Sequence, residues 1–160
     1  MRSLKTEIKW ALIFTVVGLL WMVLENVTGL HGKYIEYHLY LTNLFAIPAI
    51  IMMVMALKEK KRIFYNGHMS YGKGLLSGVI LSAFIALLSP LAQWVTSYVI
   101  APEYFPNVIE KSLEIGYHVS REDAEAQFNY PNYAKQGAIF GFLMGVVTSA
   151  IAMIFIRSKR

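Results

Sequence analysis

The sequence predicts an all-α membrane protein with four transmembrane helices and both termini in the cytoplasm. Three observations carry this prediction: four long apolar runs, a hydrophobic composition, and basic residues gathered at one set of run ends. Of the 160 residues, 56% are hydrophobic, and the mean hydropathy is +0.47. Because a soluble domain of this size could not bury four such runs, we expect one membrane domain over residues 1–160.

Each apolar run is long enough to cross the ~30 Å hydrocarbon core of a bilayer, which takes about 20 helical residues. A bilayer offers the backbone no hydrogen-bond partners, so the runs must be helices. The first run begins like a signal peptide, but it is too long and no small-residue cleavage site follows it, so we expect it to be retained. The predicted helices cover residues 8–30, 39–57, 74–100 and 137–156.

Basic residues are concentrated at one set of helix ends. Eleven of the 15 lysines and arginines lie before the first run, between the second and third, or after the fourth. The positive-inside rule places these ends in the cytoplasm. The net charge of +5 therefore indicates orientation and attraction to anionic lipids, and does not indicate nucleic-acid binding. The side chains expected to contact anionic lipid are Lys60, Lys61, Arg62 and Lys73.

Small residues recur at four-residue spacing on the third and fourth predicted helices. This spacing lets two backbones approach closely, which is how helices associate in lipid. We expect the two helices to pack antiparallel along these faces, and a dimer interface is the alternative. Prolines 48 and 90 predict kinks in the second and third helices. The predicted packing residues are Gly74, Gly78, Gly137, Gly141, Gly145 and Ser149.

Glu25 is the one charge deep inside a predicted run. A carboxylate there costs ~2.5–3.5 kcal/mol on insertion scales, and such groups usually face the protein interior. Helical rise places Asn43, Ser89 and Gln93 at a similar depth, in the outer third of the bilayer. These four residues either satisfy one another and set helix register, or they line a small outward-facing pocket. In the second interpretation Glu25 binds a cation, a proton or a lipid headgroup.

The connection between the second and third helices contains a partial P-loop motif. Residues 67–74 match its first seven positions, but Gly74 stands where Ser or Thr should hold Mg²⁺. Asn66-Gly67 is instead a preferred two-residue turn, so we predict a β-hairpin from residues 62–65 and 68–71.

A histidine cluster lies in the short outer connection. His31, Glu36 and His38 are close in sequence, but their spacing matches no standard ligand pattern. We therefore expect no metal and no cofactor.

The long connection, residues 101–136, carries six acidic and three basic residues and is predicted to lie outside. Apolar spacing favours a short amphipathic helix over residues 107–117. Ser120 begins a motif that resembles a capping box and predicts a second short helix, 121–128. Pro131 is expected to break the chain before the fourth membrane helix. The two short helices would form a solvated lid or a docking surface for a periplasmic partner.

Several segments together resemble one bacterial family. They are YNGHMSYGKG before the third helix, SREDAEAQF in the acidic outer connection, and GAIFGFLMG at the start of the fourth helix. The chain resembles, over essentially its whole length, the Bacteroidota membrane family catalogued as domain of unknown function 4199. The resemblance implies a multi-pass protein of the bacterial inner membrane and implies no catalytic residues.

Three functional hypotheses remain from the sequence. The first is a non-enzymatic accessory or structural subunit, alone or as a homo-oligomer, with lipids and a protein bound to the outer connection as its partners. The second is a small transporter or a lipid- or ion-handling protein that uses the pocket around Glu25. A membrane enzyme is the weakest, since no nucleophile–base pair or metal set stands out.

Overall fold

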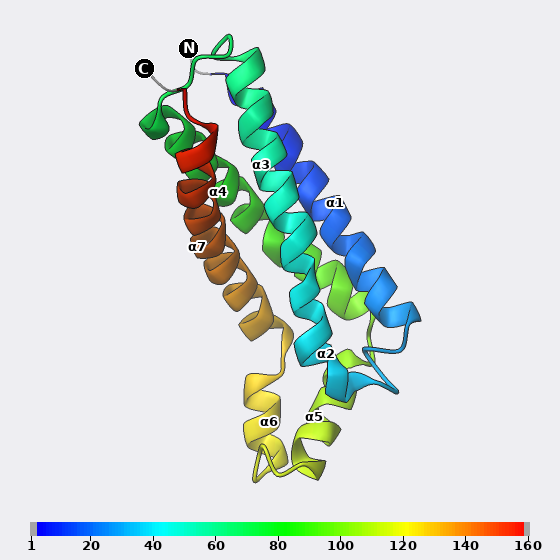
Figure 1. The fold of residues 1–160 in the computed structure, drawn as a ribbon. Helices are drawn as coiled ribbons and strands as arrows, with labels where there is room; N and C mark the ends of the chain where they lie inside the picture. Colours follow the sequence, from blue (N-terminus) through cyan, green and yellow to red (C-terminus); the bar gives the residue numbers. More distant parts are fainter. Residues whose placement is uncertain (1–2, 159–160) are drawn as a thin grey trace.

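The computed structural model describes residues 3–158, and all regular secondary structure within that range is helical (Figure 1). Four spans are long and apolar enough to cross a membrane, which matches the four predicted runs. The spans are longer than predicted at most of their ends. They cover Lys5–Val27, Ile35–Ile63, Tyr71–Ile100 and Tyr130–Ile156.

The first and fourth spans are single α-helices, α1 (Lys5–Val27) and α7 (Tyr130–Ile156). The second and third change helix type near the ends that lie away from the start of α1. The second consists of α2 (Ile35–Leu41), the 3-10 turn η1 (Thr42–Phe45) and α3 (Ala46–Ile63). The third consists of α4 (Tyr71–Val95) and the π-helix η2 (Thr96–Ile100).

The two prolines expected to produce kinks occupy different contexts. Pro48 is the third residue of α3, which directly follows the 3-10 turn, so the irregular backbone precedes the proline. Pro90 lies inside α4, which continues through it for another turn before the π-helix begins.

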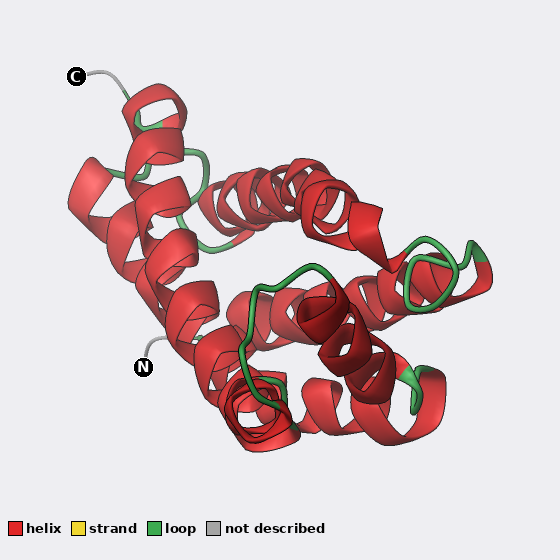
Figure 2. Ribbon diagram, turned by 90° about the horizontal axis from the view of Figure 1, so that it is seen from below, coloured by secondary structure: helices red, strands yellow, loops and turns green. Residues whose placement is uncertain are grey.

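The start of α1 and the end of α7 lie at the same end of the bundle, together with the turn between α3 and α4 (Figure 1). We name this the terminal end. The opposite end, the cap end, carries α2 and the short helices α5 (Tyr104–Glu114) and α6 (Arg121–Gln127); Figure 2 views the molecule from there. Three of the basic residues counted above, Arg2, Lys159 and Arg160, lie outside the described residues.

Two helix starts at the cap end, those of α6 and α7, have side-chain caps. The Ser120 hydroxyl accepts a hydrogen bond from the Asp123 amide at 3.1 Å, as the capping motif predicted. The prediction that Pro131 breaks the chain is wrong. Asn129 caps α7 through the Asn132 amide, and Pro131 occupies the first turn, where a missing N–H costs nothing.

The predicted β-hairpin between the second and third spans is also wrong. Helix α3 continues to Ile63, and residues 64–70 form turns and irregular backbone without strands. Asn66 and Gly67 do adopt positive φ, 47° and 83°, as the turn dipeptide suggested. Helix is favoured over strand because the last turns of α3 consist mainly of lysine and arginine, which are good helix formers, and because Lys60 and Lys61 form hydrogen bonds with α1 and α7.

The apolar core lies toward the terminal end and joins all four spans. Its members include Ala11, Met53, Leu81 and Met153. Large apolar side chains also cover the outward faces of the bundle, as Leu87 at 74% exposure and Phe155 at 81% show. Faces of this kind suit lipid rather than water.

Helices α4 and α7 pack against each other more extensively than any other pair. A Cβ added to Gly78 would overlap the Ser149 side chain of α7, and one added to Gly74 would overlap Met153. Gly145 stands against Ser82 in the same way. The predicted small-residue ridge therefore lies between these two helices.

Two other glycines of the predicted ridge have more space around them than those at the close contact between α4 and α7. A Cβ added to Gly137 would meet only the Ser89 hydroxyl, at 3.0 Å, and one added to Gly141 would meet nothing within 4 Å.

We expect Gly78→Ala to lower the free energy of unfolding by about 1–3 kcal/mol, because its methyl group overpacks the contact with Ser149. Gly141→Ala is the matched control, since it adds the same methyl group into open space on α7. Adding Ser149→Gly to Gly78→Ala should recover most of the loss. Denaturant unfolding in detergent measures all three variants, and an equal loss in Gly141→Ala would contradict the packing argument.

Candidate functional site

Glu25 lies near the last turn of α1 at the cap end, and its side chain is only 2% exposed. The Trp21 indole, one turn earlier, donates a hydrogen bond to Glu25 Oε1 at 2.6 Å. The helical spacing of four residues places both side chains on one face. One carboxylate oxygen is thereby engaged within α1 itself.

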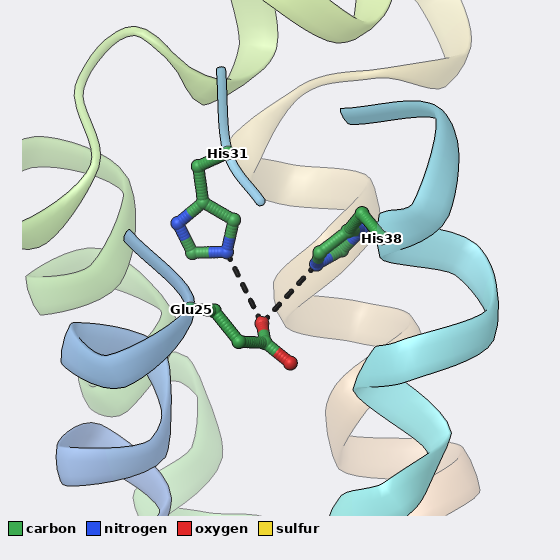
Figure 3. Close-up of side chains that lie close together, drawn as sticks. All are labelled: Glu25, His31 and His38. Carbon is green, nitrogen blue, oxygen red and sulfur yellow. Dashed lines mark hydrogen bonds and ion pairs between the residues drawn. The ribbon is translucent and has the colours of Figure 1, made fainter. Parts of the chain in front are cut away.

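Two histidines from different segments engage the other oxygen (Figure 3). His31 Nε2 and His38 Nε2 each lie 3.2 Å from Glu25 Oε2. His31 belongs to the turn after α1, and His38 to α2. Each contact is a hydrogen bond in the tautomer that carries its proton on Nε2, since an ionised carboxylate only accepts.

The backbone after α1 explains how His31 reaches a residue six positions earlier. Gly29 adopts φ +84°, which favours glycine, and its carbonyl accepts hydrogen bonds from the amides of Gly32 and Tyr34. The chain thus turns back over the end of α1 and carries the imidazole toward Glu25.

Helix α5 covers this cluster from the cap end. The Tyr104 hydroxyl lies 3.4 Å from His38 Nδ1 and 3.3 Å from the Tyr133 hydroxyl of α7. Asn107 donates a side-chain hydrogen bond to the His31 carbonyl at 2.9 Å. Burial, and then the neighbouring Tyr133, raises the pKa of Tyr104 well above its usual range, so its hydroxyl stays neutral. We name Glu25, His31 and His38 the cap cluster.

An apolar groove of about 380 Å³ runs along the surface beside the cap cluster. Leu24, Tyr37 and Leu44 contribute to its walls, and Glu25 contributes to its lining. The groove lies between α1 and the α2–η1 segment.

A second buried polar cluster lies at the terminal end. Lys60 of α3 and Glu7 of α1 form an ion pair of 2.8 Å, and their side chains are 1% and 2% exposed. The Ser77 hydroxyl of α4 donates to the other Glu7 oxygen at 2.6 Å. These residues, which we name the terminal cluster, tie three spans together.

The structure does not gather the four residues predicted to share a level with Glu25. Asn43 is exposed, and its amide donates to the Leu39 carbonyl of its own span. Gln93 donates to Ser97 one turn later, and Ser89 faces Gly137. Glu25 takes its partners instead from Trp21 and from the histidines, because equal depth does not ensure that side chains share a direction.

The prediction of lipid-contacting lysines needs one correction. Lys60 is sealed against Glu7 and cannot reach a lipid headgroup. Lys61 is half-buried, and its ammonium group donates a hydrogen bond to the Ile156 carbonyl at 2.8 Å. Arg62 and Lys73 are exposed, and the Lys73 ammonium lies 5.5 Å from the ring centre of Tyr65.

Sequence reasoning missed both clusters for identifiable reasons. Glu7 and Lys60 lie at the margins of apolar runs, where charges are usually solvated, and 53 positions separate them. For the histidines, Glu36 was weighed as the acidic partner, yet it is about half exposed and lies 3.7 Å from Lys111. The useful signal was Gly29, since a glycine just after a helix end commonly reverses the chain.

A family model described as Protein of unknown function (DUF4199) matches residues 9–158. No curated protein and no solved structure matches the chain.

Proposed function

Because the chain belongs to the DUF4199 family, whose function is unknown, we propose a role from its own residues. The protein is a non-enzymatic accessory or structural subunit of a bacterial inner membrane, alone or as a homo-oligomer. Both termini face the cytoplasm, and the cap end faces the periplasm. The observation that carries the proposal is that both oxygens of each buried carboxylate, Glu7 and Glu25, are hydrogen-bonded within the chain.

Each buried carboxylate has both oxygens occupied by donors from the protein. Glu7 accepts from Ser77 and Lys60, and Glu25 accepts from Trp21 and the two histidines. A carboxylate held in this way supports helix association better than it supports general-base chemistry, which needs an oxygen free to receive a proton.

The two clusters lie at opposite ends of the bundle. At 1.5 Å of rise per residue, Glu7 and Glu25 are roughly 27 Å apart along α1, close to the thickness of a hydrocarbon core. Three hydroxyls between them, on Thr15, Ser82 and Ser149, each donate to a carbonyl four residues earlier in their own helix. These three hydroxyls therefore form no hydrogen-bonded path from one carboxylate to the other, which supports a structural role over transport.

The tip of the cap end supports a protein partner. Ile115, Tyr117 and Val119, between α5 and α6, are 65%, 64% and 98% exposed. Three apolar side chains grouped on a connection that otherwise carries many charges are typical of a contact surface. A periplasmic or membrane protein is the partner that the outer position of this tip favours.

The absence of native cysteine makes the orientation directly testable. In right-side-out membrane vesicles, we expect a membrane-impermeant maleimide to label Val119→Cys and to spare His68→Cys. Permeabilisation should expose His68→Cys, which lies on the turn between α3 and α4. The reverse pattern would overturn the orientation.

The same Val119→Cys variant tests the partner surface. A thiol-directed crosslinker applied to native membranes should give one discrete product larger than the monomer, either a dimer or a complex with another protein. His68→Cys, crosslinked after permeabilisation, is the matched control and should remain monomeric. Val119→Cys that also stays monomeric would contradict a subunit role for the cap end.

One observation favours a second candidate, a lipid- or ion-handling protein. The apolar groove beside the cap cluster includes Glu25 in its lining. A lipid retained in native mass spectrometry of the wild-type protein, and lost in Glu25→Gln, would favour this candidate over the subunit role.

A further inference from the structure

We propose that the cap cluster is a binding site for one divalent transition-metal ion of the zinc type, held by Glu25, His31 and His38. This inference does not depend on the subunit role, since a metal could serve a structural protein, a transporter or an enzyme. It rests on the types of donor atom, their spacing, and the groups that hold them.

The three side chains present a donor set that transition metals prefer. Two imidazole nitrogens and one carboxylate oxygen bind zinc in many proteins, whereas Mg²⁺ and Ca²⁺ take oxygen ligands. The ligand atoms of the three residues all lie within 4.8 Å of one another. Figure 3 shows both imidazoles directed at the same carboxylate oxygen.

The two nitrogen-to-oxygen distances in the cap cluster fit metal ligands as well as hydrogen bonds. Both Nε2 atoms lie 3.2 Å from Glu25 Oε2. Ligands about 2.0–2.1 Å from a tetrahedral zinc ion are about 3.3–3.4 Å apart, whereas charge-assisted N–H···O bonds are about 2.7–2.9 Å long. The same carboxylate makes a bond of 2.6 Å to Trp21, so it accepts a short bond where the partner permits one.

The site is also enclosed and oriented as metal sites are. The exposed fractions of Glu25, His31 and His38 are 2%, 4% and 17%. Trp21 fixes the carboxylate oxygen that would not bind the metal, and the Tyr104 hydroxyl lies beside His38 Nδ1. Partners of this kind set ring orientation and tautomer around bound metals.

His31 supplies the observation that the protein alone leaves unexplained. Its Nδ1 is buried and has no hydrogen-bond partner among the described residues. Among the described residues, the 3.2 Å contact of Nε2 with Glu25 Oε2 is therefore the hydrogen bond that holds this ring. Coordination through Nε2 would join the turn after α1 to α2 and would leave the ring's proton on Nδ1, where a buried water would serve as its acceptor.

Cobalt and zinc titration of the wild-type protein tests the site. After chelator treatment, the detergent-solubilised protein should bind one equivalent of Co²⁺ and develop visible absorption bands, which Zn²⁺ should abolish by displacement. Zn²⁺ should also raise the unfolding temperature, because it binds only the folded site. A protein that binds neither metal in a saturable way would overturn the proposal.

Histidine variants locate the binding. The double variant His31→Gln and His38→Gln should bind roughly 100-fold or more weakly, since the loss of even an outer-shell partner costs about 10–100-fold. His68→Gln and His118→Gln alter the other two histidines and should keep wild-type affinity. Binding that survives the first pair of changes, or disappears with the second, would show that surface histidines hold the metal.

A measurement on the wild-type protein covers the case in which the double variant does not fold. Zn²⁺ should protect His38, which is 17% exposed, but not His68, from diethyl pyrocarbonate, as read by mass spectrometry of peptides. Equal modification with and without Zn²⁺ would reject the site.

Discussion

Glu7→Gln is expected to lower the free energy of unfolding by about 3–5 kcal/mol, because it leaves Lys60 charged and without its partner in a buried position. The Lys60 side chain is 1% exposed, so solvent cannot replace the carboxylate. Ser77 would lose its anionic acceptor at the same time. Denaturant unfolding in detergent micelles, followed by circular dichroism, measures the loss.

A double-mutant cycle separates the ion pair from the individual side chains. Lys60→Met should be similarly destabilising, whereas Glu7→Gln combined with Lys60→Met should cost less than the two losses added together. The exposed pair of Lys9 and Glu59 is the matched control, since Lys9 is 50% exposed. Lys9→Met should change stability by about 1 kcal/mol or less. If the double variant loses as much free energy of unfolding as the two single variants added together, Glu7 and Lys60 do not stabilise the fold as a unit.

Glu25→Leu is expected to cost about 2–4 kcal/mol, because it leaves Trp21, the buried His31 and the partly buried His38 without their acceptor. Glu25→Gln should cost less, since its side-chain oxygen can still accept from one of these donors. The effect should be local to the cap end. Hydrogen exchange should accelerate in residues 28–41 and 104–114, and α7 should be unchanged beyond its first turns.

Glu36→Gln is the control for the cap cluster. Glu36 lies on the same connection, but its side chain is 53% exposed. Its ion pair with Lys111 is 3.7 Å long and lies at the surface. Its substitution should change stability by about 0.5 kcal/mol or less. A loss at Glu36 that equals the loss at Glu25 would show that general acidity of the cap end, and not the cluster, stabilises the fold.

The four spans could be predicted from the sequence because long apolar runs in a membrane have almost no alternative to helix. The predicted ends at residues 100 and 156 are those observed, but most of the others lie beyond the predicted ones, because helices continue past the apolar segment where local chemistry permits. Helix α7 begins at Tyr130 rather than at 137, since Asn129 caps it and Pro131 suits the first turn. Helix α3 extends to Ile63 through a charged stretch whose lysines find partners in the bundle.

Depth alone was a poor guide to the candidate site. Asn43 lies near the level of Glu25, but it belongs to a 3-10 turn and bonds to its own span. The histidines that do reach Glu25 lie in a turn and in a helix that apolar periodicity does not reveal. Predicting them required the direction of the chain after Gly29, which depends on a positive φ rather than on hydropathy.

Flux through reconstituted proteoliposomes tests most directly the claim that both buried carboxylates hold the bundle together rather than carry a substrate. Proton and zinc entry should be measured with trapped fluorescent indicators for the wild-type protein, Glu25→Gln and protein-free liposomes. Closed clusters predict that all three preparations leak at the same rate, whether or not the cap cluster binds metal. Wild-type flux that exceeds the protein-free rate and is lost in Glu25→Gln would contradict the structural role and establish a transport function.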